Sequence, residues 1–316
     1  MAIQQPGRTR RDLLKTAVVG AAGLVLGGGL SRAAAAQAPA GESGTLRLAD
    51  DLFVLRLPGQ ENIVAHTSAE GLVLVDGGSA AASDAVMKAV AALPGGRPIQ
   101  TLFNTHWHPE QTGLNETLGT AGKTIIAQEN TRLWLTTDVT WPWNGRKFMR
   151  LPKVAQPNRT FYATGQLDST ADAVKYGYFP DCAHTDGDLY VLFPKQNVLA
   201  VGGVMSGDGW PVMDWVTGGW IGGIVGALQR VQALANEETR IVGSRGPVLR
   251  LADVKTQLEM YATIYERLTT LLNRGRSPGE AVEAKPTKEF DARMGNGDEF
   301  VRRAFESLWG YLSPDA

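Results

Sequence analysis

Three of the four histidines in this 316-residue chain occur in patterns typical of metal ligands. His106 and His108 are one residue apart, and the carboxylate of Glu110 follows two residues later. His184 lies far along the chain, shortly before an apolar run. Three neutral imidazoles are a sufficient protein ligand set for a zinc ion that keeps its fourth position for water. The sequence therefore predicts one zinc site made by His106, His108 and His184.

Apolar runs indicate how these histidines are positioned. Residues 98–103 read as a buried strand that ends just before His106, and residues 189–193 read as a strand that follows His184. Loops at strand ends are where a rigid scaffold usually presents reactive groups. Further strands are expected at residues 46–57, 62–66, 72–75, 124–127 and 197–201. Helices are expected at residues 80–93, 112–118, 221–231, 254–272 and 298–311, with another capped by Asn130.

Five short motifs, in this order, resemble the metallo-β-lactamase fold superfamily. They are LVLVDGG at 72–78, THWHPE at 105–110, AHTDGD at 183–188, NVLAVGG at 197–203 and IVGSRGP at 241–247. The resemblance extends from about Gly44 to the carboxyl terminus. It implies an α/β (α+β) chain folded as a four-layer αββα sandwich, with the metal centre at one edge between the two sheets. It also implies a metal-dependent hydrolase.

The sequence departs from this family at the ligands of a second metal. The family pattern H-x-H-x-D-H here ends in Glu110 and Gln111, Gly203 stands where the family has a metal-bridging Asp, and Arg245 replaces a final His. A guanidinium keeps its proton and cannot ligate a cation, and an amide oxygen is a poor substitute for imidazole on zinc. The sequence therefore predicts one zinc ion per chain, with the second site dismantled.

Two charged residues are the candidates for catalytic roles. Glu110 is expected to accept the proton of the attacking water, because it stands two residues past His108. Arg245 is expected to pair with Glu110 or to hold an anionic group of the substrate, and an ordinary surface turn is the alternative.

Three aspartates are expected to support the metal ligands. The resemblance implies that Asp76, after the strand 72–75, supports the metal loop, so it is expected to accept a hydrogen bond from an imidazole; capping of the following helix is the alternative. Asp186 and Asp188 are expected to form the turn after His184.

The substrate is expected to be a small molecule with an apolar or aromatic group, because aromatic residues gather in two expected loops. They are Trp134, Trp141, Trp143 and Phe148, with Met149, in one region and Trp210, Trp215 and Trp220 in the other. Core packing is the alternative for each of them, and Trp210 and Trp220, beside glycines, look least like core residues. An ester, lactone or amide is the expected substrate class. Two other functions compete: a binding protein that has lost turnover, and a mononuclear iron enzyme acting on thiols.

The ends of the chain and its charge set the remaining expectations. Residues 1–38, with Arg10 and Arg11 before a short apolar run, resemble a twin-arginine signal peptide, with an uncleaved membrane anchor as the alternative. Residues 39–45 are the expected linker and residues 46–316 the folded domain. This organisation implies the twin-arginine export machinery as a partner, a periplasmic location and no stable membrane insertion after cleavage. The formal net charge of −1, without a basic run in the mature part, argues against nucleic acid as a partner.

Overall fold

The computed structural model describes residues 44–167 and 173–312. The proposed signal peptide, residues 1–38, lies outside the described residues, as does most of the linker. The first strand begins at Gly44 and so takes in the last two residues that the sequence assigned to the linker. Among the described residues, no helix is long and apolar enough to span a membrane.

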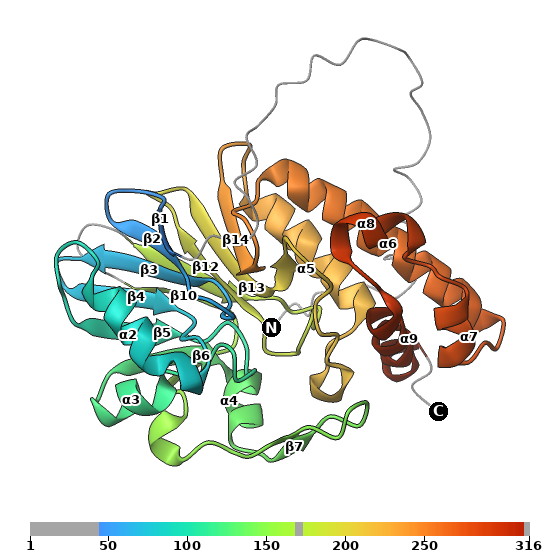
Figure 1. The fold of residues 1–316 in the computed structure, drawn as a ribbon, viewed down its shortest axis with the longest axis horizontal. Helices are drawn as coiled ribbons and strands as arrows, with labels where there is room; N and C mark the ends of the chain where they lie inside the picture. Colours follow the sequence, from blue (N-terminus) through green and yellow to red (C-terminus); the bar gives the residue numbers. More distant parts are fainter. Residues whose placement is uncertain (1–43, 168–172, 313–316) are drawn as a thin grey trace, which may run out of the picture. The chain divides into compact units, whose positions relative to one another are not determined.

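Two β-sheets form the centre of the domain (Figure 1). The first has seven strands in the order β1-β2-β3-β4-β5-β6-β9, antiparallel from β1 to β4 and parallel from β4 to β9. Its strands are β1 (Gly44–Arg47), β2 (Leu52–Arg56), β3 (Ile63–Ser68), β4 (Gly71–Val75), β5 (Ile99–Phe103), β6 (Thr124–Gln128) and β9 (Arg159–Phe161). The second has five strands in the order β10-β11-β12-β13-β14, of which only β13 and β14 run parallel. They are β10 (Thr164–Leu167), β11 (Val174–Tyr178), β12 (Leu189–Phe193), β13 (Val198–Ser206) and β14 (Arg240–Arg245).

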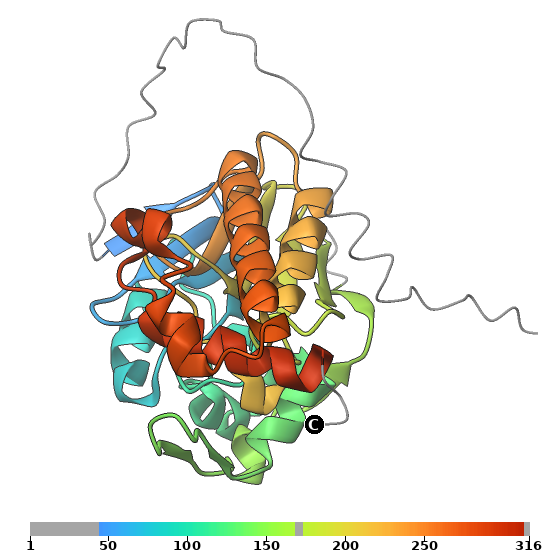
Figure 2. The same cartoon turned by 90° about the vertical axis from the view of Figure 1, so that its right-hand side faces the viewer.

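Helices cover the outer face of each sheet, which completes the four layers expected from the sequence (Figures 1 and 2). On the first sheet lie α2 (Ser83–Ala91) and α3 (Asn115–Thr120), and α4 (Glu129–Leu135) follows β6. On the second sheet α5 (Ile221–Leu234) and α6 (Leu251–Asn273) lie side by side. The short helices α7 (Pro278–Glu283) and α8 (Asp291–Met294) lead to α9 (Asp298–Leu312). A small hairpin of β7 (Val139–Thr140) and β8 (Lys147–Phe148) completes the main elements.

The strand sequences are apolar throughout because successive side chains point to opposite faces of the sheet and both faces are covered. In β2, Leu52 and Val54 pack between the two sheets, whereas Phe53 and Leu55 pack against the helices outside. Successive side chains of a strand point to opposite faces, so a strand that is covered on both faces needs no polar positions. β13 is likewise covered on both faces and is buried along its whole length.

Two local expectations differ from the structure. The run 46–57, expected as one strand, is two antiparallel strands, because the chain reverses at residues 48–51 between β1 and β2. The amino end of α4 is capped by Gln128 and not by Asn130. Gln128 still has extended backbone at the end of β6, and its side chain accepts a hydrogen bond from the Asn130 N–H. Asn130 instead lies in the first turn and donates to the Asp186 carbonyl, which ties α4 to the loop of His184.

Candidate metal centre

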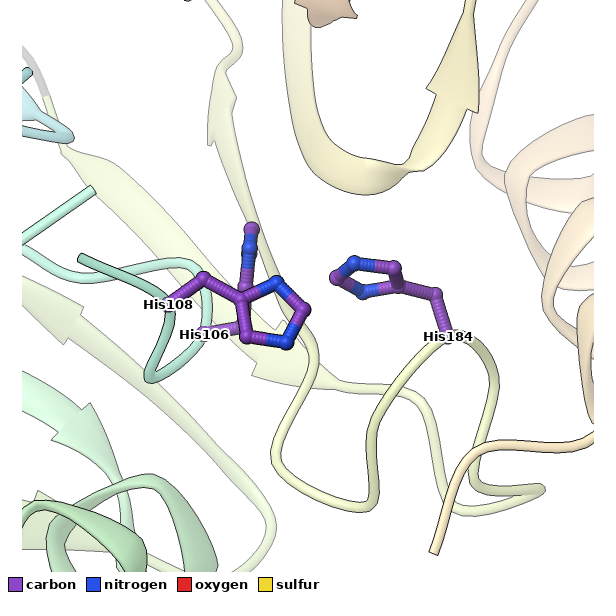
Figure 3. Close-up of side chains that lie close together, drawn as sticks. All are labelled: His106, His108 and His184. Carbon is purple, nitrogen blue, oxygen red and sulfur yellow. The ribbon is translucent and has the colours of Figure 1, made fainter. Parts of the chain in front are cut away.

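The three predicted histidines come together at one edge of the two sheets. His106 and His108 lie on the loop after β5, and His184 lies on the loop before β12 (Figure 3). One ring nitrogen from each side chain lies within 4.8 Å of the others, and all three residues are buried. The Leu189 N–H at the start of β12 donates to the Thr105 carbonyl at 2.9 Å, which joins the strand after His184 to the loop of His106.

Asp76 and Thr105 fix the ring of His106. The Thr105 hydroxyl donates to Asp76 Oδ2 at 2.8 Å and lies 3.0 Å from Nδ1 of His106. Asp76 Oδ1 also accepts the Thr105 N–H at 2.8 Å. Asp76 therefore supports the ligand through Thr105 and not by direct contact with imidazole, and it caps no helix. Its positive φ of 66° is an uncommon conformation for a residue with a side chain, and such strain often persists at functional sites.

Asp188 holds the ring and the backbone of His184 together. Its Oδ1 lies 3.0 Å from Nδ1 of His184. Its Oδ2 accepts the N–H groups of His184 and Thr185 at 2.7 and 2.8 Å. Asp188 thus forms the turn, as the sequence predicts, and it also orients the ligand.

Asp214 performs the same task for His108, and sequence reasoning missed it. Its Oδ2 lies 3.0 Å from Nε2 of His108, although the two residues are 106 positions apart. Asp214 is fully buried on the loop after β13, where Thr217 and Trp141 donate to the same oxygen at 2.8 and 3.2 Å. No local motif marks Asp214 as a partner of His108, because only the return of the chain after β13 brings them together.

These contacts decide which nitrogen of each ring is free. Nδ1 is engaged in His106 and His184, and Nε2 is engaged in His108. The opposite nitrogens are left to converge in the cluster shown in Figure 3. An acceptor behind each ring that fixes its orientation is the usual arrangement around a metal-binding histidine.

Burial favours the neutral forms that a metal needs. It lowers the pKa of His106 and of His108, and the positive charge of neighbouring imidazoles acts in the same direction. Burial also acts to lower the pKa of His184, but the carboxylates of Asp188, Asp214 and Glu61 outweigh it and raise that pKa. A cation that binds there replaces the proton favoured by these carboxylates.

On the side where the family has a second metal, the geometry is different. A Cβ atom on Gly203 would lie 2.4 Å from Cε1 of His184, so no side chain fits there while the ring keeps its place. Arg245 is exposed, and its Nε lies 3.8 Å from Asp208. The Arg245–Glu110 pair that the sequence suggested is not formed.

Glu110 lies at the rim of the site. Its Oε1 is 3.4 Å from Nη2 of Arg146, an exposed residue of the β7–β8 hairpin, and its side chain is 38% exposed. Its charge still influences His108, and it raises the pKa of Glu61. Glu110 is therefore near the centre without being enclosed in it.

Glu61 is the second residue that sequence reasoning missed. It lies on the loop between β2 and β3 and accepts a hydrogen bond from the Gln111 side-chain amide. Burial raises the pKa of Glu61 to about 7, against the lowering effects of His184, Arg245 and Gln111. Its isolated position in the sequence, 45 residues or more before the histidines, gave no signal of this role.

An aromatic cluster flanks His108. It comprises the buried residues Trp107, Leu135, Val139 and Trp141, with Trp143 and Phe148 packed against them. The Trp141 and His108 ring centroids are 5.3 Å apart. Trp210 and Trp220, which looked least like core residues, instead stack on Phe300 and Tyr311 of α9. The aromatic residues beside the metal centre thus come mainly from the hairpin region.

The comparison with known proteins agrees with this architecture. Residues 56–245 match the family model described as the metallo-beta-lactamase superfamily, and the chain belongs to that superfamily. No curated protein sequence matches the chain.

Several solved structures share the fold at low sequence identity. A metallo-beta-lactamase from Pontibacter korlensis is 17% identical with a TM-score of 0.55, over 70% of this chain and 99% of that chain. The DIM-1 metallo-beta-lactamase is 16% identical with a TM-score of 0.55, over 71% and 99%. The sec-alkylsulfatase Pisa1 from Pseudomonas sp. is 15% identical with a TM-score of 0.62, over 86% of this chain and 51% of that one. The match thus spans about half the length of the sulfatase.

Proposed function

We propose that this chain is a hydrolase that uses a single zinc ion held by His106, His108 and His184. The observation that carries the proposal is that each of these imidazoles is turned toward the other two by its own buried hydrogen-bond partner. Unrelated buried histidines have no reason to share this arrangement, whereas ligands of a metal require it.

The donor set suits zinc. Three imidazole nitrogens that are free to converge match the ligand set of catalytic zinc sites, which keep one position open. Zinc bound there would lower the pKa of a water molecule to about 7 and supply hydroxide for attack on a carbonyl carbon.

Two side chains of the rim have proposed roles in turnover. Glu110 accepts the proton of the attacking water, and its 38% exposed side chain at the rim keeps it within reach of solvent. Arg245 holds an anionic group of the substrate, which its 63% exposed side chain and weak pairing with Asp208 allow.

The proposed substrate is an ester, lactone or amide with an apolar or aromatic group. The half-buried Trp143 and Phe148 at the edge of the cluster beside His108 support this choice, because aromatic surface that is still partly exposed can bind an apolar group next to the reacting carbonyl. The fold name alone does not make β-lactams the substrate. The competing functions are separable: iron in place of zinc on elemental analysis favours a thiol enzyme, and bound metal without turnover favours a binding protein.

A screen of esters, lactones, amides and β-lactams followed by one substitution tests the proposal. Glu110→Gln should lower kcat by about 10²- to 10⁴-fold, the usual contribution of a general base, and should leave the metal content unchanged. Glu116→Gln, at an exposed position of α3, is the matched control and should have no effect. Equal turnover by the Glu110 variant would show that this carboxylate is only structural.

We also propose that residues 1–38 direct export to the periplasm by the twin-arginine pathway. The paired Arg10 and Arg11 before an apolar run support this. Changing both to Lys should trap the precursor in the cytoplasm, and unchanged periplasmic delivery would point to the general secretory route.

A further inference from the structure

Gln111 carries a buried hydrogen-bond acceptor without a partner, next to the three histidines. The residue is 1% exposed, and its side-chain oxygen Oε1 makes no hydrogen bond in the described structure. Leaving a buried amide oxygen without a partner destabilises the folded protein. Such an oxygen, at a position where the family has a metal ligand, indicates that it has a partner in the working site.

Glu61 determines which way this oxygen points. The Gln111 amide nitrogen donates to Glu61 Oε2, so the amide oxygen is turned away from the carboxylate. The backbone is fixed as well, because the Gln111 carbonyl accepts the Gly77 N–H at 2.8 Å and its N–H donates to the His108 carbonyl at 3.0 Å. While Glu61 is ionised, the amide cannot flip without losing the bond to Glu61 and setting two oxygens against each other.

The free oxygen lies on the metal-binding side of His106. The Gln111 side chain contacts the ring of His106. Nδ1 of this ring is engaged with Thr105, so the contact is on the side of Nε2. Nε2 is the nitrogen that is left to hold the metal.

We propose that Gln111 Oε1, held in place by Glu61, accepts a hydrogen bond from the water that enters beside the three histidines and orients it for attack. This inference rests on the proposed hydrolytic function. It assigns Gln111 to the attacking water and Glu61 to the positioning of Gln111. The pair occupies the side of the family's second metal, with a fixed acceptor in place of a cation.

The test uses the mature protein, without the proposed signal peptide, loaded with cobalt(II). The visible absorption of cobalt(II) reports the surroundings of the bound metal. Gln111→Leu removes the acceptor, Glu61→Leu frees the amide to flip, and Glu61→Gln keeps an oxygen for the Gln111 amide. Both Leu variants should keep one cobalt per chain and shift the absorption bands in the same direction, whereas Glu61→Gln should match the unsubstituted protein. With a substrate, both Leu variants should lower kcat by about 10- to 100-fold at unchanged KM, the equivalent of one hydrogen bond of about 1.5–3 kcal/mol. The double Leu variant should be no worse than Gln111→Leu alone.

Gln257→Leu is the matched control. Gln257 is also fully buried, donates through its amide nitrogen and has an unpartnered oxygen, but it lies on α6. Its variant should leave the cobalt bands unchanged, which separates the proposed role from the general effect of losing a buried amide.

Several results would overturn the inference. Unchanged cobalt bands in both Leu variants would show that the acceptor does not face the metal position. Loss of cobalt from Gln111→Leu would make Gln111 a ligand, and equal damage by Glu61→Gln and Glu61→Leu would make the Glu61 carboxylate itself the reactive group. Failure of the unsubstituted protein to bind cobalt would instead contradict the proposed function, and the inference with it.

Discussion

The two sides of the metal centre are built in opposite ways. On the side of the three histidines, each ring is backed by a buried partner: Thr105, Asp214 or Asp188. On the other side, a metal-bridging carboxylate is replaced by Gly203 and a histidine by the exposed Arg245.

The difference between the two sides shows what the chain has kept. Buried carboxylates are expensive unless their hydrogen bonds are satisfied, so a set of them behind three ligands indicates a site under functional constraint. On the opposite side the exclusion of a second metal is steric as well as chemical, since the His184 ring fills the space beside Gly203. The two sides together support the proposal of a one-metal site.

Removing one of the three histidines should have the largest effect on metal binding and turnover. His108→Ala leaves two imidazoles and removes the imidazole partner of the buried Asp214, so the protein should lose its metal on dialysis and all turnover with it. Elemental analysis after dialysis measures this. His66→Gln changes the one histidine outside the cluster and should keep the metal, and retention of full metal by His108→Ala would remove this residue from the ligand set.

Placing the family's aspartate at position 203 should not restore a second metal site. Gly203→Asp returns the bridging carboxylate, but its Cβ would displace the His184 ring, which lies 2.4 Å away. We expect the variant to bind its single metal at least about 10-fold more weakly, because an ordering partner is lost with the ring position. Competition with a chelator measures the affinity, with Gly310→Asp, at an open position of α9, as the control. A gain of a second metal would show that only the missing carboxylate, and not the position of the His184 ring, excludes a second ion.

A smaller effect is expected behind His108. Asp214→Asn keeps the size of the side chain but removes the charge that holds Nε2 of His108, so metal affinity should fall by about 10- to 100-fold. The fold should survive, since Asn can still accept from Thr217 or Trp141. Asp208→Asn, an exposed residue on the same loop, is the control. Unchanged affinity in the Asp214 variant would mean that the three ligands need no such support.

Sequence reasoning succeeded where the signal is local. The pattern of His106 and His108 after an apolar run, and of His184 before another, is contained within a few residues of each histidine. The strands were visible because burial on both faces makes them continuously apolar, as in β2 and β13. The order of the motifs was enough to predict the four layers.

The parts that could not be predicted depend on contacts between distant residues. Asp214 and Glu61 reach the centre on loops whose paths are set by the packing of the sheets, and neither has a neighbouring pattern that marks it. The Gln128 cap was missed for a related reason, because Gln is a less typical capping residue than Asn130 and its role depends on where β6 ends.

The number of metal ions per chain tests the central claim most directly. The protein should be purified from the periplasm, dialysed against metal-free buffer and analysed for zinc and iron against the protein concentration. A complete one-metal site predicts one tightly held zinc per chain, because Gly203 and Arg245 exclude a second. Two zinc ions at full occupancy, or one ion that survives His108→Ala, would contradict it.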